Sequence, residues 1–195
     1  MKNIHIHKSE RRAFTIVETL VAITVLMIAI AGPLSIAGKG LTAALYSRDQ
    51  MIATYLAQES MEIIKNAKDN NVANSVSPWL KLTGFVLPAD LSDCRLGSNQ
   101  ACDAGAVDGN MFNACSSSAC PIYFNPATGG YSDTTGVGFQ TTLFSRYFYL
   151  SQPSQPAIAC NDAASECEVT VIVTWNEGTI QNQISITSEM ANVIR

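Results

Sequence analysis

The sequence is poor in the residues that enzymes most often use for acid–base chemistry. It has two histidines, His5 and His7, and both lie within the first 13 residues. Histidine is the commonest general base near neutral pH, so the rest of the chain cannot form a Ser-His-Asp or Cys-His arrangement. It also contains no G-x-x-x-x-G-K-[ST] or G-x-G-x-x-G phosphate-binding loop. We therefore expect neither an enzyme nor a bound cofactor.

Metal-binding patterns are missing as well. No two cysteines have the C-x-x-C spacing of zinc or redox sites, and the closest pair, Cys115 and Cys120, is separated by four residues. Oxygen ligands for calcium gather between residues 90 and 110, but their spacing fits no EF-hand loop. Turn formation accounts better for this composition, so no metal site is expected. The residues concerned are Asp90, Asp93, Asp103, Asp108 and Asn110.

Positive charge is scarce beyond the N-terminus. Residues 1–13 carry a net charge of +3, whereas the remainder has 8 basic and 15 acidic residues and a net charge of −7. An acidic domain without a basic cluster is a poor binder of phosphate backbones. Nucleic acid is therefore not expected as a direct partner.

Charge is absent altogether between Thr19 and Gly38. These roughly 20 residues are enough to cross a bilayer as a helix. Because basic residues precede them, the N-terminal side should stay in the cytoplasm and the rest should be translocated. A secretory signal peptide is the first alternative, but its apolar stretch is shorter. The nearest small-residue cleavage sites, at residues 29–31 and 37–39, lie within a helical pattern that continues past them.

The segment from Arg11 to Ile23, RRAFTIVETLVAI, resembles the processing motif of type IV prepilins and type II secretion pseudopilins. In that family a basic leader is cut before a Phe that opens the apolar segment, and a Glu stands four residues later. The resemblance implies that a prepilin peptidase and methyltransferase cuts between Ala13 and Phe14 and methylates the new amine of Phe14. The family usually has Gly before the cut, where this chain has the equally small Ala13.

Glu18 is the Glu of this motif and the residue that we assign to assembly. A carboxylate inside an apolar run costs several kcal/mol in lipid unless it meets a partner, although the helix dipole favours it near a helix start. After cleavage, the amine of Phe14 would lie one turn away or on a neighbouring subunit, and pairing would neutralise both groups. The alternative is an unpaired Glu18 at the membrane surface. The implied partners are membrane lipid and other pilin or pseudopilin subunits.

Four segments are expected along the chain: a cleaved leader at 1–13, a transmembrane and assembly helix at 14–38, an amphipathic continuation of the helix at 39–71, and an extracytoplasmic β-rich head at 72–195. Apolar residues recur at helical spacing from Leu41 to Ile63. The helix should run to about Ala67, with a kink at Gly32-Pro33. Two helices divided at residues 38–40 are the alternative.

The head reads as β-structure. Together with the helix it predicts an α+β, pilin-like fold, in which the long N-terminal helix packs on an antiparallel sheet of about four strands. Residues 88–120 are expected to form an irregular cross-linked loop and residues 129–138 a glycine-rich connector, and the aromatics of 143–150 favour a core over a carbohydrate site. Candidate strands are Trp79–Leu87, Ile122–Phe124, Leu143–Leu150, Glu168–Trp175 and Thr179–Thr187, the last two forming a hairpin.

Six cysteines follow the apolar segment, an even number that suggests disulfides in an oxidising compartment. Six cysteines allow 15 pairings, and reduced buried thiols are the alternative. Sequence neighbours are favoured because they close short loops. The pairings so favoured are Cys94–Cys102, Cys115–Cys120 and Cys160–Cys167.

These features lead to a single-pass protein of the cytoplasmic membrane that becomes a structural subunit of a type IV pilus or of a type II secretion pseudopilus. A looser resemblance of residues 55–66, 171–175 and 184–186 to minor pilins and minor pseudopilins favours a minor subunit. The competing hypothesis is a signal-anchored extracytoplasmic binding or adhesion domain that never polymerises. Glu18 discriminates between them, because a simple anchor gains nothing from it.

Overall fold

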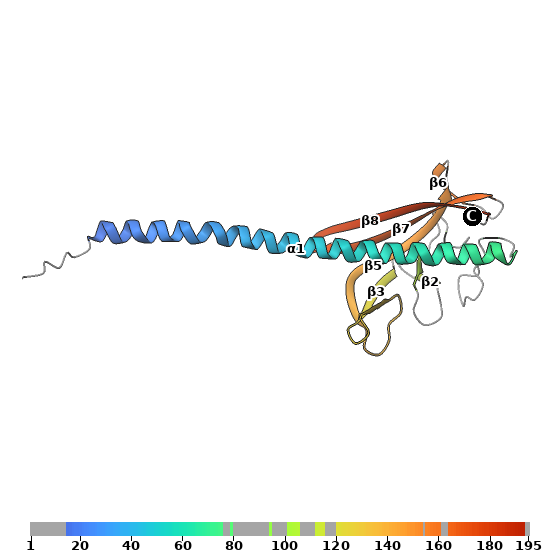
Figure 1. Ribbon diagram of the computed structural model, residues 1–195, viewed down its shortest axis with the longest axis horizontal. Helices are drawn as coiled ribbons and strands as arrows, with labels where there is room; N and C mark the ends of the chain where they lie inside the picture. The colour runs from blue at the N-terminus through green and yellow to red at the C-terminus, as the bar shows by residue number, and fades with distance from the viewer. Residues whose placement is uncertain are drawn as a thin grey trace, which may run out of the picture. The chain divides into compact units, whose positions relative to one another are not determined.

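The computed structural model describes residues 15–75, 79, 94, 101–105, 112–115, 120–153, 155–160 and 164–193. Within these residues the chain forms one long helix, α1 (Ile16–Ala73), followed by eight strands (Figure 1). The chain divides into two compact units, Met1–Tyr46 and Ser47–Arg195. The first contains the beginning of α1, and the second contains the rest of α1 and all the strands.

Helix α1 runs without interruption through residues 38–40, so the alternative of two separate helices is wrong. Pro33 lies inside the helix and, having no N–H, leaves the carbonyl of Ala29 without its usual donor. The kink expected there stays a prediction. Two hydroxyls in the apolar run are satisfied locally, because Thr19 Oγ1 donates to Ile16 O and Thr24 Oγ1 to Val21 O, each at 2.8 Å. The helix can therefore carry these threonines in an apolar surrounding.

The second part of α1 lies alongside the sheet (Figure 1), and one stripe of its side chains is buried. The stripe recurs every three or four residues, as an amphipathic helix requires, and several members are small, which brings the helix axis close to the strands. Its members are Ala53, Leu56, Ala57, Ser60, Met61, Ile64, Ala67 and Asn71.

Helix α1 continues beyond Ala67, where the sequence pattern fades. Asn71 is buried and its side-chain amide donates to Trp79 O at 3.0 Å, so the last turns are held by a polar contact rather than by an apolar stripe. Ser75 follows the helix with φ of 54°, a left-handed conformation common after helix ends. Trp79 itself is buried in a turn, not in the strand expected there, and residues 80–87 of that strand lie outside the described residues.

The strands form one sheet in which every pairing is antiparallel. The central strand, β5, pairs with β7 on one side and with β1, β3 and β6 elsewhere along its length; β8 pairs with β7, β2 with β1 and β4 with β3. The bounds are β1 Ala101–Ala104, β2 Phe112–Cys115, β3 Cys120–Asn125, β4 Gly130–Ser132, β5 Gln140–Gln152, β6 Gln155–Ala159, β7 Glu166–Glu177 and β8 Ile180–Ala191.

The fold class is confirmed, but the described residues form eight strands where about four were expected. Three of the predicted strands correspond to β5, β7 and β8, and Ile122–Phe124 lies within β3. The additional strands β1, β2, β4 and β6 have three to five residues each. Segments this short carry too little periodicity to be recognised, and they are strands because longer neighbours offer them hydrogen bonds. Strands β1 and β2 occupy part of the expected irregular loop, and β4 part of the glycine-rich connector.

The β7–β8 hairpin keeps one register from Glu166 opposite Ala191 to Glu177 opposite Ile180. Its loop is Gly178-Thr179, with Gly178 at φ of 62°. A two-residue hairpin loop needs a positive φ at its first position, which glycine adopts without strain. The hairpin predicted from the alternating pattern is therefore confirmed.

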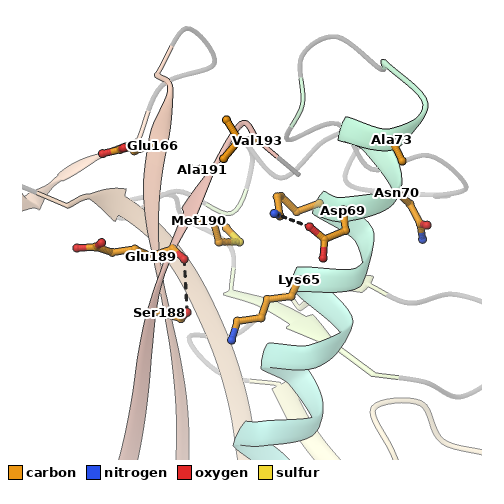
Figure 2. Close-up of a pocket in the computed structure, with 11 residues that line it drawn as sticks. Lys65, Asp69, Asn70, Ala73, Glu166, Ser188, Glu189, Met190, Ala191 and Val193 are labelled. Atoms are coloured by element: carbon orange, nitrogen blue, oxygen red, sulfur yellow. Dashed lines mark hydrogen bonds and ion pairs between the residues drawn. The ribbon is translucent and has the colours of Figure 1, made fainter. Parts of the chain in front are cut away.

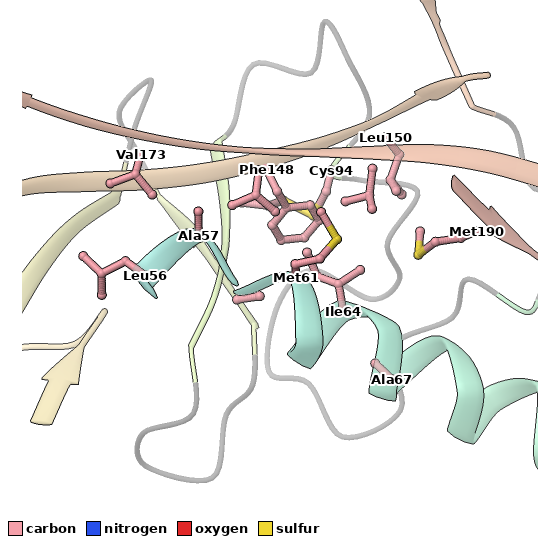
Figure 3. Close-up of a cluster of buried hydrophobic side chains, with 14 of the residues drawn as sticks. Leu56, Ala57, Met61, Ile64, Ala67, Cys94, Phe148, Leu150, Val173 and Met190 are labelled. Carbon is pink, nitrogen blue, oxygen red and sulfur yellow. A yellow bond between two sulfur atoms is a disulfide. The ribbon is translucent and has the colours of Figure 1, made fainter. Parts of the chain in front are cut away.

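The core lies between α1 and the facing side of β5, β7 and β8. Phe148 and Leu150 of β5 and alternate residues of β7 point toward the helix, where they meet Leu56, Met61 and Ile64 (Figure 3). Tyr147 and Tyr149 alternate with them and are half-buried. The aromatic strand is thus divided between a buried phenylalanine side and a partly exposed tyrosine side.

Candidate functional site

The start of α1 is organised by two residues, Thr15 and Glu18. Thr15 Oγ1 accepts a hydrogen bond from the backbone N–H of Glu18 at 3.2 Å, and Thr15 O accepts from Thr19 N at 3.2 Å. Thr-x-x-Glu is the spacing of a capping box, in which the first side chain satisfies a free N–H of the first turn. Glu18 therefore stands where the helix dipole favours a negative charge.

Behind this cap the helix surface is apolar on all sides. Ile16 is 84% exposed and Ile36 is 74% exposed, and the large side chains between them are also exposed. The helix contains a stretch long and apolar enough to cross a membrane. The exposed apolar residues are Ile16, Val17, Leu20, Val21, Ile23, Val25, Leu26, Met27, Ile28, Ile30, Leu34 and Ile36. Because so much exposed apolar surface is unfavourable in water, we expect lipid or other apolar helices to cover it.

Residues 8–32 match the family model of the prokaryotic N-terminal methylation motif. This match supports a relationship of the chain to the type IV pilin and pseudopilin family. The match ends at residue 32 and does not distinguish a minor subunit from a major one. Members of this family are structural proteins rather than enzymes. Neither a curated protein nor a solved structure matches the chain.

The residues expected to serve processing and assembly, Ala13, Phe14 and Glu18, all lie within the matched segment. Ala13 and Phe14, where cleavage and methylation are expected, lie outside the described residues. Glu18 lies in the first turn of α1 and is exposed. The pairing of Glu18 with the Phe14 amine therefore stays a prediction, whereas the local cap formed with Thr15 is part of the structure.

The pilin-like head contains a buried ionic cluster that sequence reasoning missed. Arg146 of β5 is 2% exposed, and its guanidinium forms a fork with the Asp103 carboxylate, Nε to Oδ1 at 2.5 Å and Nη2 to Oδ2 at 3.2 Å. Its third nitrogen, Nη1, reaches helix α1 and donates to Leu56 O at 2.8 Å and to Glu59 Oε2 at 3.0 Å. One side chain therefore joins β1, β5 and α1.

Burial and charge act in opposite directions on this cluster. Complete burial raises the pKa of Asp103, and the facing Arg146 guanidinium opposes that rise. Burial on its own would lower the pKa of Arg146, but Asp103 and then Glu59 outweigh it, so the pKa of Arg146 is raised and the guanidinium stays charged. Each charge is tolerated inside the head only because the other is present.

Gly105 leaves room for the end of this cluster. A Cβ at Gly105 would lie 3.1 Å from Asp133 Cγ and 3.2 Å from Arg146 Nη2, distances that are tighter than ordinary carbon contacts. Asp133 adds a second negative charge near Asp103 and raises the pKa of Asp103 further. The expected role of Asp103 as a turn-forming residue is wrong, since Asp103 lies in β1 and is 0% exposed.

The sequence did hold a signal for Arg146. It alternates with Phe144, Phe148 and Leu150 in β5, so strand periodicity puts it on the buried side. A buried arginine requires an acidic partner, but no local rule points to Asp103, which precedes it by 43 residues.

Two of the three favoured disulfides are present. Cys94 is bonded to Cys102 and Cys160 to Cys167, with Cα–Cα distances of 5.5 and 5.8 Å. Cys120 is buried and disulfide-bonded as well. The side chain of Cys115 lies outside the described residues, so the pairing of Cys115 with Cys120 stays a prediction.

An open groove of about 530 Å³ lies between the end of α1, the start of β7 and the end of β8 (Figure 2). Lys65 and Lys68 line one side and Glu166 and Glu189 the other, and Lys68 pairs with Asp69 at 2.5 Å. Among the described residues no group of three or more His, Cys, Asp or Glu could hold a metal ion. The groove brings together charged surface residues and no nucleophile–base pair.

Proposed function

We propose that the protein is a structural subunit of a type IV pilus or of a type II secretion pseudopilus. Its precursor is inserted in the cytoplasmic membrane with the basic leader inside and the head outside. A prepilin peptidase then cuts between Ala13 and Phe14 and methylates the new amine. The mature helix leaves the membrane and joins a filament. The core of this filament is a bundle of the apolar N-terminal helix segments of its subunits.

One observation carries the proposal: the helix surface from Thr19 to Gly38 is exposed and free of charge, and it overlaps the segment that matches the methylation motif, residues 8–32. In the membrane, lipid covers this surface, and in a filament the same surface of neighbouring subunits can cover it. Burial of apolar area is non-directional, so by itself it would not fix the axial register between neighbouring helices of the filament. The carboxylate of Glu18 supplies this register, because it is costly in an apolar interior unless it meets the amine of Phe14.

The second candidate function is a head domain held at the membrane by a permanent anchor. The apolar helix alone fits this role equally well. The motif favours the filament, because an acid four residues after Phe14 gives a permanent anchor no advantage. Within the proposal, residues 39–71 continue the helix and residues 72–195 form the extracytoplasmic head. The looser resemblance noted above favours a minor subunit.

Fractionation of cells that carry the assembly machinery distinguishes the two functions. The processed chain is expected to sediment with sheared surface filaments, or with pseudopili when the secretion machine is overproduced, and the unprocessed chain to stay with membranes. Recovery of the processed and unprocessed chain in the membrane fraction alone, with filaments present in the same cells, would favour the anchored domain.

A further inference from the structure

Strand β1 contains Asp103 of the ionic cluster but is paired with the rest of the sheet through few residues. It has four residues, and its pairing with β5 consists of Cys102 opposite Phe148. Its other pairing is to β2, which is equally short. The position of Asp103 therefore depends on more than the strand ladder.

The Cys94–Cys102 disulfide supplies this additional hold. Cys102 directly precedes Asp103, and both cysteines are 1% exposed. Cys94 lies beside Phe148 in the core (Figure 3). The bond thus fixes the residue next to Asp103 at the point where β1 meets β5.

Helix α1 depends on the same point through Arg146. The guanidinium holds Leu56 O and Glu59, in the middle of the buried stripe of the helix. If Asp103 moves away, Arg146 loses both bonds of the fork and keeps its ion pair with Glu59, whose side chain is 38% exposed. A buried guanidinium that has lost its main counter-charge is more stable in water. Its movement toward water would break its contacts with the helix.

We propose that the Cys94–Cys102 disulfide is an oxidation-dependent latch that holds helix α1 on the sheet through Asp103 and Arg146. In the dithiol form β1 is released and the middle of the helix stripe loosens. In the disulfide form Asp103 is fixed against Arg146 and the helix is held. The latch concerns the head alone and does not require that the protein polymerise.

Latching is a thiol–disulfide exchange. The thiolate of one cysteine attacks an external disulfide, such as that of an oxidoreductase, and forms a mixed disulfide while one external thiol leaves. The second cysteine thiolate then attacks the sulfur of the first and releases the other external thiol. The two cysteines lose two electrons and two protons, and the external disulfide becomes a dithiol. Excess dithiol reverses both steps.

The second disulfide offers a matched control. Cys160–Cys167 closes a sequence separation of 7 residues against 8 for Cys94–Cys102, so the loop-entropy effect of removing either is similar. It joins the chain after β6 to the start of β7, and none of the hydrogen bonds of Arg146 involves it. A difference between the two removals therefore reports the latch rather than the loss of a loop.

The test is hydrogen exchange of the full chain in detergent micelles, followed on peptides covering residues 53–67. Cys94→Ser/Cys102→Ser should speed exchange there on the order of tenfold, whereas Cys160→Ser/Cys167→Ser should change it by about threefold at most. Both removals are then repeated with Arg146→Met and Asp103→Asn, which abolish the charges. In that background the two removals should become equal.

Equal loosening by the two disulfide removals in the native background would overturn the latch, as would a difference that persists without the charges. If Cys94→Ser/Cys102→Ser unfolds completely in the native background, its exchange is compared with that of Cys160→Ser/Cys167→Ser in the background without the charges. If Cys94→Ser/Cys102→Ser is then as well protected from exchange as Cys160→Ser/Cys167→Ser, the latch is supported. If it is not, the disulfide acts through the loop alone and the proposal is wrong.

Discussion

Replacement of Glu18 by Ala or by Gln is expected to remove the protein from filaments while leaving membrane insertion and leader cleavage intact. Insertion depends on the apolar run and the basic leader, neither of which changes. Incorporation depends on the carboxylate, because a neutral side chain cannot pair with the amine of Phe14. The amounts of processed chain in the filament and membrane fractions measure the effect, which should be a fall on the order of tenfold or more in the filament fraction.

A control must separate the charge of Glu18 from the helix cap that it forms with Thr15. Loss of a helix cap costs about 1 kcal/mol and could disturb the start of the helix by itself. Glu18→Gln keeps a side-chain acceptor at the third helical position, as capping boxes allow. Thr15→Ala removes the Oγ1 contact and keeps the charge. Loss of incorporation in Glu18→Gln with normal incorporation of Thr15→Ala is the expected pattern, and the reverse would assign Glu18 to capping.

Arg146→Met is expected to destabilise the head by about 3–5 kcal/mol, as removal of one partner from a buried ion pair does. Asp103 would remain fully buried and lose the guanidinium that opposes its raised pKa, so the carboxyl should take up a proton. Glu59 and Leu56 would also lose their link to β5. Urea unfolding of the full chain in detergent, followed by tryptophan fluorescence, measures the change.

Arg48→Met is the matched control for this prediction. Arg48 pairs with Asp49 at 2.9 Å, but its side chain is 62% exposed, and exposed pairs contribute about 0–1 kcal/mol. The combined change Arg146→Met and Asp103→Asn should recover part of the loss, because no ionisable group then remains unpaired at Asp103. Similar midpoints for Arg146→Met and Arg48→Met would mean that the buried cluster contributes little.

Long elements were predictable because they repeat their pattern many times. The stripe on α1 and the alternation in β5, β7 and β8 each extend over at least three repeats, so periodicity alone indicates helix or strand. The β7–β8 hairpin was indicated by its two alternating strands, and its loop is built around Gly178, whose φ is 62°. Sequence therefore defines the helix and one side of the sheet.

The rest of the head depends on contacts that sequence does not encode locally. Asp103 lies in a segment rich in Asp, Asn, Gly and Cys, where a turn is the reasonable expectation. It becomes a buried strand residue because Arg146 neutralises it and Cys102 is bonded to Cys94. Both partners are fixed by tertiary structure. Conversely, the assembly motif was recognisable from the sequence because its residues are contiguous.

The central claim is that the chain is processed as a prepilin before it functions. Intact-mass measurement of the protein, purified from a cell that has a prepilin peptidase, tests this claim most directly. The account predicts a chain that lacks residues 1–13 and begins at Phe14 with one added methyl group on its amine. A mature protein that still begins at Met1, without methylation, would contradict it.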